Sequence, residues 1–524
     1  MTTQFIIAPL VIVLLTAVLT LLTRWNTRVQ ITLSIMGMVG YCVSVGILVM
    51  KVLEGEIIIG TYQVGNWPAP FGITLVADAL SVFMLSLTAV VGTISLLYSI
   101  RYIDLFGQRV SFHSLFHFMI AGATGAFLTG DIFNLFVWFE VMLMASYVLV
   151  VFYGGPDHTE AAFKYLILNL FGSAIMLLAI GGIYATTGTL NMADISRRLA
   201  MPMQYSINTG PILGLASLLF IVFALKAGLV PFHFWAPETY QAAPVPVAAV
   251  LTGIVKKVGV YAIIRLYFTI FATASIPSLE MIGFAGSTFL AFFGPILFLM
   301  ATGSILVGGI GAIDQDTMEG LLAYSSISQV GFIVLPLAIG ASTSVGSVRI
   351  LAIGSALIYT FNHGVAKALL FLITGTIKDR VGTSYFNQLG NLSNVFPIIA
   401  ASFFIGGITL IGLPPLTGFF AKVLIFNTAI KTGSTIGIAI ALLGAVFTLI
   451  YVSRAWQRAF WGSGSQEYNE TSHDNIQILM IAVLAIVIIG FGLGFDLLYQ
   501  FARDAAIAAI NRHDYITAVL GGKS

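Results

Sequence analysis

The stretch LLFIVFALKAGLVPFHFW, residues 218–235, decides the fold of this chain. It belongs to an apolar run of the length that a membrane-spanning helix needs, about 20 residues. Lys226 places a charge inside the run, and Pro231 removes a backbone donor and clashes with the preceding turn. We therefore expect a broken helix with an ionisable group beside the break. Irregular backbone at membrane depth occurs where it is buried in protein or lines a wet cavity.

A second stretch repeats this pattern about 190 residues later. IGGITLIGLPPLTGFFAKVL, residues 405–424, joins two apolar segments through a proline pair and carries Lys422 near its end. The residues expected to break the two helices are Gly228, Pro231 and Pro237 in the first and Gly412, Pro414, Pro415 and Gly418 in the second. Matching interruptions in two halves point to inverted repeats that flank a transport path. A pair of ordinary proline kinks is the alternative.

The composition of the whole chain agrees with a polytopic membrane protein. Hydrophobic residues make up 58% of 524 positions, charged residues make up 8%, and the mean hydropathy is +1.00. Soluble domains carry about 25% charged residues, so a large water-facing surface is excluded. The net charge of +2 argues against nucleic-acid binding. A single cysteine, Cys42, excludes a disulfide framework and a thiolate metal site.

Hydropathy predicts an all-α fold with about 14 transmembrane helices in a single integral membrane domain, residues 1–524. The candidate spans start near residues 5, 31, 74, 112, 132, 162, 211, 246, 279, 320, 346, 396, 434 and 475. We divide them into N-terminal helices (5–110), two five-helix repeats (111–272 and 279–461) and a last helix with its tail (475–524). The longest polar connections are 54–73, 189–210 and 462–474. The tail from Phe501 to Arg512 alternates apolar and charged residues, which is typical of an interfacial helix.

Lysine and arginine in the loops predict the orientation, because they favour the cytoplasmic side. With fourteen spans both termini share one side. The loops after odd-numbered spans hold eight such residues, Arg24, Arg28, Arg101, Arg109, Lys378, Arg380, Arg454 and Arg458, and the opposite loops hold five, Lys51, Arg197, Arg198, Arg349 and Lys431. This excess places the termini outside the cytoplasm, although the C-terminal tail adds three positive charges to the outer side.

Ionisable residues inside the apolar runs are the candidate functional residues. A charge at the bilayer centre costs roughly 2.5–3.5 kcal/mol even on the lenient insertion scale, so such groups face a bundle interior or a wet cavity. Five of them lie on five separate predicted helices: Glu140, Lys226, Lys257, His363 and Lys422. Acid, amine and imidazole all accept and release protons. The chain is therefore predicted to move charge through a membrane, with protons as the first candidate.

The neighbours of these residues extend the set. Lys256 and Lys257 are adjacent, so they point in different directions on a helix; we assign the central role to Lys257 and leave Lys256 open between relay and structure. Tyr261 and Arg265 share a face with Lys257. Lys367 shares a face with His363, which favours a relay over a structural histidine. The alternative interpretation of these lysines is that their side chains extend to the membrane interface and have no role in a relay.

Several other polar positions are less specific. Asp78 begins the third span, where it either pairs with a buried base or caps the helix. His233 follows Pro231 in the first break and could extend a relay outward. Ser325, Ser328 and Gln329 supply hydrogen-bonding capacity, although helical hydroxyls often bond their own backbone.

Soluble catalytic signatures are missing from the sequence. It has no HExxH, no CxxC and no nucleophile elbow. The closing GGKS, residues 521–524, resembles the end of a phosphate loop, but Thr517 stands where that motif requires glycine. No cofactor is expected.

Four stretches together resemble a known family. DIFNLFVWFEVMLMASY (131–147), FALKAGLVPFHFWAPETYQAAP (223–244), KKVGVYAIIRLY (256–267) and NHGVAKALLFLITG (362–375) are similar to the antiporter-like subunits shared by respiratory complex I, membrane-bound hydrogenases and Mrp-type antiporters. The resemblance covers nearly the whole chain and is greatest to the D-type Mrp subunits. It implies two inverted five-helix repeats, each with a broken helix.

The resemblance also implies roles for individual residues. In that family a glutamate on the fifth helix, here Glu140, pairs with a lysine on the seventh, here Lys226. Lys257 matches the lysine that joins two half-channels, and His363 matches the histidine that continues the relay. The last group is a lysine or a glutamate, and Lys422 favours the Mrp branch.

The function implied is a proton-translocating subunit of a multisubunit Na+/H+ antiporter. It would lie in the cell membrane, with other Mrp-type subunits as partners and H+ and Na+ as transported ions. A proton-pumping subunit of a redox-driven complex is the alternative, and a structural or self-sufficient channel protein is a third interpretation. The cation and its site cannot be read from the sequence.

Overall fold

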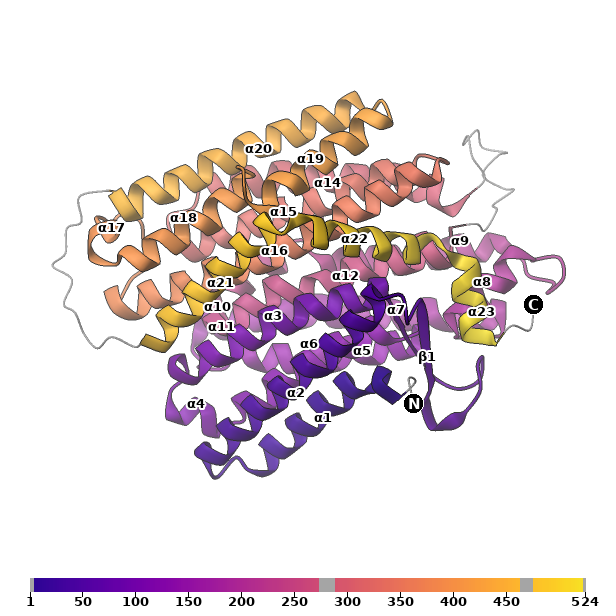
Figure 1. Cartoon of the computed structure of the whole chain (residues 1–524), viewed down its shortest axis with the longest axis horizontal. Helices are drawn as coiled ribbons and strands as arrows, with labels where there is room; N and C mark the ends of the chain where they lie inside the picture. The colour runs from indigo at the N-terminus through magenta and orange to yellow at the C-terminus, as the bar shows by residue number, and fades with distance from the viewer. Residues whose placement is uncertain (1–3, 273–287, 462–474, 522–524) are drawn as a thin grey trace.

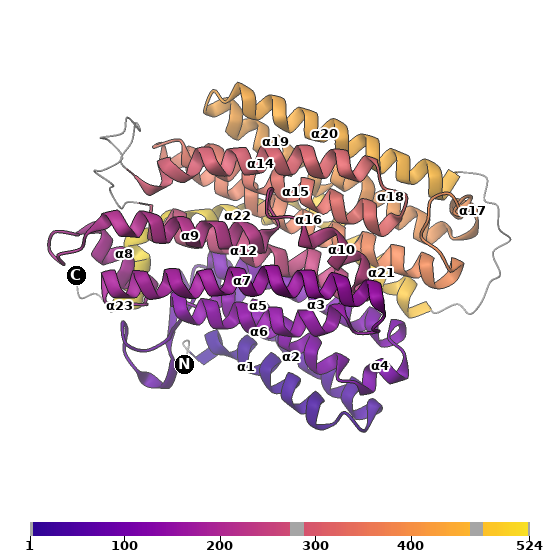
Figure 2. The same ribbon diagram turned by 180° about the vertical axis from the view of Figure 1, so that it is seen from behind.

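The computed structural model describes residues 4–272, 288–461 and 475–521. Long helices lie side by side and fill most of the molecule, as Figure 1 shows. The N-terminal helices form one flank, and the helices around residues 400–460 form the other. Figure 2 gives the same arrangement from behind. The first turn of the first helix and the end of the last helix lie on the same side, as an even number of spans requires.

The first half of the chain holds the following helices: α1 (Gln4–Leu22), α2 (Thr27–Leu53), α3 (Ala79–Tyr102), α4 (Leu105–Arg109), α5 (Phe112–Leu128), α6 (Ile132–Val150), α7 (Pro156–Thr187), α8 (Met192–Ala200), α9 (Thr209–Ala227), α10 (Trp235–Ala242), α11 (Val245–Val250) and α12 (Lys256–Ile263). Two π-helical segments, η2 (Leu251–Val255) and η3 (Ile264–Ile270), flank α12 and join it to α11 as one continuous span.

The second half holds α14 (Phe289–Ile313), α15 (Met318–Ala341), α16 (Gly346–Val381), α17 (Leu392–Val395), α18 (Pro397–Ile411), α19 (Thr417–Lys431), α20 (Thr435–Trp456), α21 (Asn475–Leu493), α22 (Phe495–Ile510) and α23 (Arg512–Leu520), with the π-helical η4 (Gln457–Trp461) after α20. A 3-10 turn, η1 (Val64–Asn66), follows the first strand.

Twelve helices among the described residues are long and apolar enough to cross a membrane, and α5 and α18 are shorter apolar helices. The fold is therefore the predicted all-α polytopic membrane fold, and the exact number of fourteen spans stays a prediction. Most predicted starts lie within a few residues of observed helix starts. The start near residue 279 and the polar connection 462–474 lie outside the described residues.

Both predicted helix breaks are present. α9 ends at Ala227, and the chain resumes as α10 at Trp235; α18 ends at Ile411, and α19 begins at Thr417. Each first half-helix is closed by a glycine with positive φ, Gly228 at 65° and Gly412 at 90°, a conformation that side chains disfavour. The first break is held against the second half of the chain, because Ser304 of α14 accepts a hydrogen bond from the Val230 amide at 2.9 Å.

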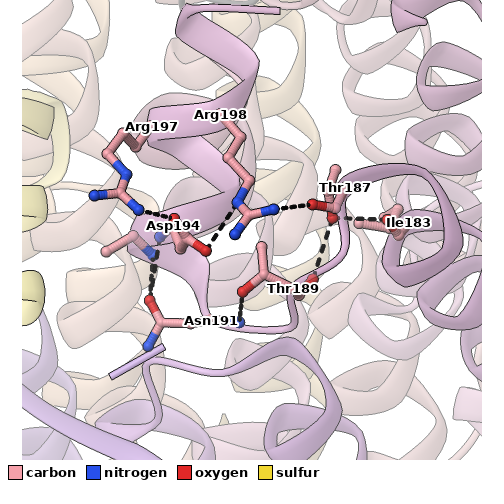
Figure 3. A network of polar contacts seen from close by, with 8 residues as sticks. Ile183, Thr187, Thr189, Asn191, Asp194, Arg197 and Arg198 are labelled. Carbon is pink, nitrogen blue, oxygen red and sulfur yellow. Dashed lines mark hydrogen bonds and ion pairs between the residues drawn. The ribbon is translucent and has the colours of Figure 1, made fainter. Parts of the chain in front are cut away.

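Two of the polar connections carry structure that hydropathy did not predict. The first connection and the predicted start of the third span form an antiparallel hairpin of β1 (Ile59–Gln63) and β2 (Thr74–Asp78), so that α3 begins at Ala79 rather than near residue 74. The second contains α8, shown in Figure 3. There the buried carboxylate of Asp194 forms ion pairs with Arg197 at 2.6 Å and Arg198 at 3.0 Å. Arg198 also donates to the Thr187 carbonyl at 2.8 Å. Two arginines counted in the orientation argument are thus ion-paired within the protein.

The C-terminal tail differs from the interfacial helix that its pattern predicted. α22 packs against α3 and α16, and Figure 1 shows it crossing that face of the molecule. Phe501 is buried, with its ring 5.1 Å from that of Phe83, and a row of alanines lies on the same face of the helix. The small side chains allow the helix to lie close to its neighbours, so the charged positions are left on its outer face.

Candidate functional site

The first group of buried polar residues joins α6, α7 and α9. Ser173 of α7 donates a short hydrogen bond to the Glu140 carboxylate and accepts one from Lys226 Nζ at 3.2 Å. Lys226 is 4% exposed, and its ammonium lies 4.9 Å from the centre of the Phe139 ring. The predicted Glu140 and Lys226 are therefore brought together, with a serine hydroxyl between them.

The break after α9 is the second contact point. A Cβ on Gly228 would lie 2.8 Å from Lys256 Cε, so this lysine stem packs directly against the break. Lys256 is fully buried, and its Nζ reaches the Ser326 carbonyl of α15 at 3.3 Å and its hydroxyl at 3.4 Å. The side chain that sequence reasoning left open thus spans from the first broken helix to the second half of the chain.

The adjacent Lys257 points to a different place, as two neighbours on a helix must. Its ammonium donates a short hydrogen bond to the Thr252 carbonyl in η2. Beside that carbonyl, the span crosses α16 at two glycines: a Cβ on Gly364 would lie 3.0 Å from the Gly253 carbonyl oxygen. His363 precedes Gly364 in the chain. The close crossing therefore brings the backbone of the Lys257 segment next to that of His363.

His363 and Lys367 occupy one face of α16, as their spacing predicted. His363 is fully buried, and neither ring nitrogen has a hydrogen-bond partner within the described residues. Lys367 is also fully buried, and it donates to the Leu322 carbonyl at 2.9 Å and, by a short bond, to the Ser325 hydroxyl of α15. An unpaired imidazole and an ammonium held by neutral groups are suited to proton exchange rather than to a permanent ion pair.

Past Lys367, a polar cluster fills the space between α15, α16 and α20. Gln329 donates to Tyr451 at 2.8 Å and to Thr448 at 3.1 Å, and its carbonyl accepts a short bond from Tyr359. Tyr359 stacks on Phe332 with ring centres 5.5 Å apart. This cluster lies between the Lys367 contact and the last lysine, because the same Phe332 ring also faces Lys422.

Lys422 folds back onto its own broken helix. Its ammonium donates to the Ile411 carbonyl at the end of α18 at 2.8 Å and lies 5.0 Å from the centre of the Phe332 ring. A Cβ on Gly412 would lie 2.8 Å from Lys422 Cδ. The two breaks thus share one design, in which a lysine stem packs on the left-handed glycine, although the first break uses Lys256 and the second uses Lys422.

Asp78 and His233 contact other parts of the chain. Asp78 accepts from the Ser81 amide at 2.9 Å as the cap of α3, and it also pairs with Arg265 at 2.7 Å. Both alternatives considered for it therefore hold, and Arg265 is an ion-pair partner. His233 lies in the first break, where it is 7% exposed and its Nδ1 has no partner within the described part of the chain.

Sequence reasoning missed Ser173. Asn169 could have indicated it, because this second polar side chain lies four residues earlier in the same apolar helix. The two residues therefore share one polar face. Ser325 and Gln329 were noted only as hydrogen-bonding capacity; Ser325 contacts Lys367, and Gln329 is the centre of the polar cluster with Tyr359, Thr448 and Tyr451. Ser328 instead bonds the Ile305 carbonyl of α14 at 3.2 Å. The described residues contain no group of three His, Cys, Asp or Glu side chains that could hold a metal ion.

Comparison with known proteins agrees with this arrangement. Residues 129–448 match the family described as NADH:quinone oxidoreductase/Mrp antiporter, TM. The chain is 35% identical over 460 residues to the D-type subunit of the Na+/H+ antiporter of Alkalihalophilus pseudofirmus, covering 87% of this chain and 88% of that protein. It is also 35% identical over 405 residues to the N-type subunit of the NADH-quinone oxidoreductase of Desulforudis audaxviator, covering 76% and 75%.

A solved structure of the Mrp complex from Dietzia contains a chain that superposes with a TM-score of 0.86 at 25% identity, covering 99% of both chains. Together with the family match over more than half of the sequence, these similarities establish where the chain belongs. It is a member of the NADH:quinone oxidoreductase/Mrp antiporter family of membrane proteins.

Proposed function

We propose that this chain is a proton-translocating subunit of a multisubunit Na+/H+ antiporter in the cell membrane. The observation that carries the proposal is the row of Glu, Lys and His side chains from α6 to α19, in which Glu140 is partly buried and the others are buried. Protons would move along this row, from the region of Glu140 and Lys226 through Lys257, His363 and Lys367 to Lys422 or in reverse. The similarity to the Na+/H+ antiporter protein of Alkalihalophilus pseudofirmus supports Na+ as the exchanged ion.

The coupling between members of the row would be electrostatic. Two unit charges at 4 Å interact by about 4 kcal/mol at an effective dielectric constant of 20. A proton that arrives at Lys226 would strengthen its attraction to Glu140, whereas its departure would release the carboxylate. Each change of charge alters the affinity for a proton at the next member, so movement at one end is felt along the row.

Partner subunits are part of the proposal. We propose that other subunits complete the transporter and take part in binding Na+. The Mrp complex from Dietzia, whose chain resembles this one, is a multisubunit assembly in keeping with that arrangement.

The test is proton flux in inverted membrane vesicles that contain the chain and the proteins encoded beside it. A pH gradient is established, the electron donor is removed, and NaCl is added. We expect sodium to collapse the gradient, and Glu140→Gln or Lys226→Ala to abolish that response while the complex still assembles. Glu54→Gln, an exposed glutamate at the end of α2, is the matched control. Wild-type flux in an assembled Lys226→Ala complex would contradict the proposal.

A second candidate is a proton-pumping subunit of a redox-driven complex. The similarity to the NADH-quinone oxidoreductase protein of Desulforudis audaxviator favours it. In that case sodium would leave the gradient unchanged, and proton movement would require the electron donor of a redox partner. The same vesicles therefore distinguish the two candidates.

A further inference from the structure

A cavity of about 430 Å³ opens where α7 and α15 begin and α10 ends. Four carboxylates line it: Asp157, Glu160, Glu238 and Glu319. This is the face that the distribution of lysine and arginine predicts to be cytoplasmic. None of the ionisable residues of the row lines this cavity.

Glu319 differs from the other carboxylates of this cavity. Glu160 and Glu238 share the exposed ammonium of Lys164, at 2.7 and 2.8 Å. Glu319, in the first turn of α15, is only 6% exposed, and neither carboxylate oxygen has a hydrogen-bond partner among the described residues. Lys378, which is half exposed, lies 3.4 Å from Oε1. Oε2 is therefore a buried oxygen at the cavity without a partner.

The helix that carries Glu319 leads directly to the buried lysines. Leu322 and Ser325, which contact Lys367, follow one and two turns later, about 4.5 and 9 Å along the helix axis. Ser326, on the neighbouring face, contacts Lys256. One helix thus connects the cavity with two of the lysines, and Glu319 is the acidic group at its outer end.

We infer that this cavity is where protons leave water for the lysine row, and that Glu319 is the group that receives them. This inference rests on the proposed function and identifies the place where the transported protons enter the protein. The Glu319 carboxylate takes a proton from hydronium, which becomes water. The resulting carboxylic acid releases the proton to water that enters between it and Ser325, about 9 Å further along the axis of α15, and this water passes it to the neutral amine of Lys367. Glu319 returns to its carboxylate form as Lys367 becomes ammonium.

The surroundings of Glu319 suit this step better than cation binding. The titratable groups that face the cavity or Glu319 are Asp157, His158 and Glu160 of α7, Glu238 of α10, Lys378 of α16, Tyr102 of α3 and Tyr385, and Lys164 of α7 pairs with two of the carboxylates. Their net negative charge raises the local concentration of protons. Within the described residues, these groups do not converge on one point as metal ligands would.

The test is the pH dependence of flux in vesicles that hold the complete complex. Glu319→Gln should slow sodium-driven proton movement about tenfold or more near pH 8, as expected for loss of a proton-transfer group, and the deficit should shrink as the pH falls because hydronium becomes abundant. Glu319→Asp should keep most of the rate. Glu54→Gln, an exposed glutamate that does not line this cavity, is the matched control and should behave as wild type.

Each outcome has a defined meaning. An assembled Glu319→Gln complex with wild-type flux at all pH values would overturn the inference, and so would a loss that is equal at every pH, because that pattern indicates a structural role. If the wild type exchanges no sodium, the proposed function fails, and the variants are compared by donor-driven proton flux instead. A wild type that moves no protons under either drive would overturn both proposals.

Discussion

Ser173 sets how strongly Glu140 and Lys226 can interact. Its hydroxyl has a single hydrogen, which it donates to the carboxylate while the ammonium donates to its oxygen. When Lys226 loses its proton, the neutral amine can accept instead, and the hydroxyl is free to turn. The serine therefore couples the protonation of Lys226 to the hydrogen bonding of Glu140 without a direct contact between the two charges.

Removal of this hydroxyl should uncouple the two residues. Ser173→Ala is expected to slow proton movement about tenfold, less than the roughly 10²–10⁴-fold contributed by a group that itself transfers the proton, because Ser173 only links the two ionisable groups. Sodium-driven collapse of a pH gradient in vesicles measures the rate. Ser173→Thr keeps the hydroxyl and should retain most of the flux. Equal rates for the alanine and threonine variants would show that the hydroxyl plays no part.

Asp131, just before α6, has a titration that affects stability. Its side chain accepts from the Asn134 amide at 2.8 Å, and burial raises its pKa to about 6. Because the pKa is higher in the folded chain than in the unfolded chain, ionisation destabilises the fold. That cost is fully present above about pH 6 and is lost as the pH falls toward 4.

Asp131→Asn keeps the cap acceptor and removes the charge. We expect the variant to be more stable than wild type at pH 8, by up to about 3 kcal/mol, and equal to it near pH 4. Thermal unfolding of the purified protein in detergent at the two pH values measures this difference. A variant that is less stable at pH 8 would show that the carboxylate charge itself is needed.

At the level of single residues, sequence reasoning located the buried charges but not their neutral partners. Glu140, Lys226 and Lys367 stand out because a charge in an apolar run has a known cost. Ser173 and the Thr252 carbonyl do not stand out, because hydroxyls and backbone carbonyls are common in every helix. Glu319 was missed for a different reason: it lies at a helix end, where a carboxylate is ordinary.

The broken helices are the elements that position the row. In each, a glycine in the left-handed conformation ends the first half-helix, and a lysine side chain lies where a Cβ would be. The conformation and the contact act together, because any other residue would strain the backbone and displace the lysine. The break is therefore both a turn and a support for an ammonium group.

Gly412→Ala should both strain the backbone and displace the Lys422 side chain, whereas Gly433→Ala should only strain the backbone. Both glycines have positive φ, 90° and 67°, which costs an alanine roughly 1–2 kcal/mol. A Cβ at 412 would also lie 2.8 Å from Lys422 Cδ, whereas nothing lies within 4 Å at 433. We expect loss of flux for Gly412→Ala and near wild-type flux for Gly433→Ala, measured in vesicles at matched protein levels. Equal flux in the two variants would mean that the lysine position at the break is unimportant.

Helix positions could be predicted from the sequence more fully than the interruptions between them. Apolar runs and proline predict the spans and the two breaks, because both signals act locally. The π-helical segments around α12 have no such signal; η2 packs against α16 at Gly253 and Gly364, and η3 packs against α14 and α22, so both lie in long-range contacts. The β1–β2 hairpin was missed because β1 is short and lies in a polar connection, whereas the apolar residues of β2 predict the start of the third span.

Across the whole molecule, one buried ion pair ties the N-terminal helices to the centre. Asp78, before α3, and Arg265, in η3, are both almost fully buried and lie 2.7 Å apart. The guanidinium also lies 5.1 Å from the centre of the Tyr515 ring in α23, so that three distant parts of the chain meet there. Such long-range contacts cannot be read from local patterns, although the individual charges can.

The role of this pair can be separated from that of the row. Asp78→Asn keeps the cap of α3 but leaves Arg265 as an uncompensated buried charge, which typically costs about 3–5 kcal/mol. We expect a marked fall in thermal stability and in the yield of assembled complex. Arg265→Met in the same chain removes the orphaned charge and should recover most of both, because a buried ion pair contributes little net stability over an apolar replacement.

The double variant also decides whether Asp78 takes part in transport. If the pair is structural, the double variant should move protons at close to the wild-type rate per assembled complex, in contrast to Glu140→Gln. Sodium-driven flux, normalised to the amount of complex, measures this rate. A double variant that recovers stability but stays inactive would place Asp78 or Arg265 in the proton path, and the row would then extend to the interface between α3 and η3.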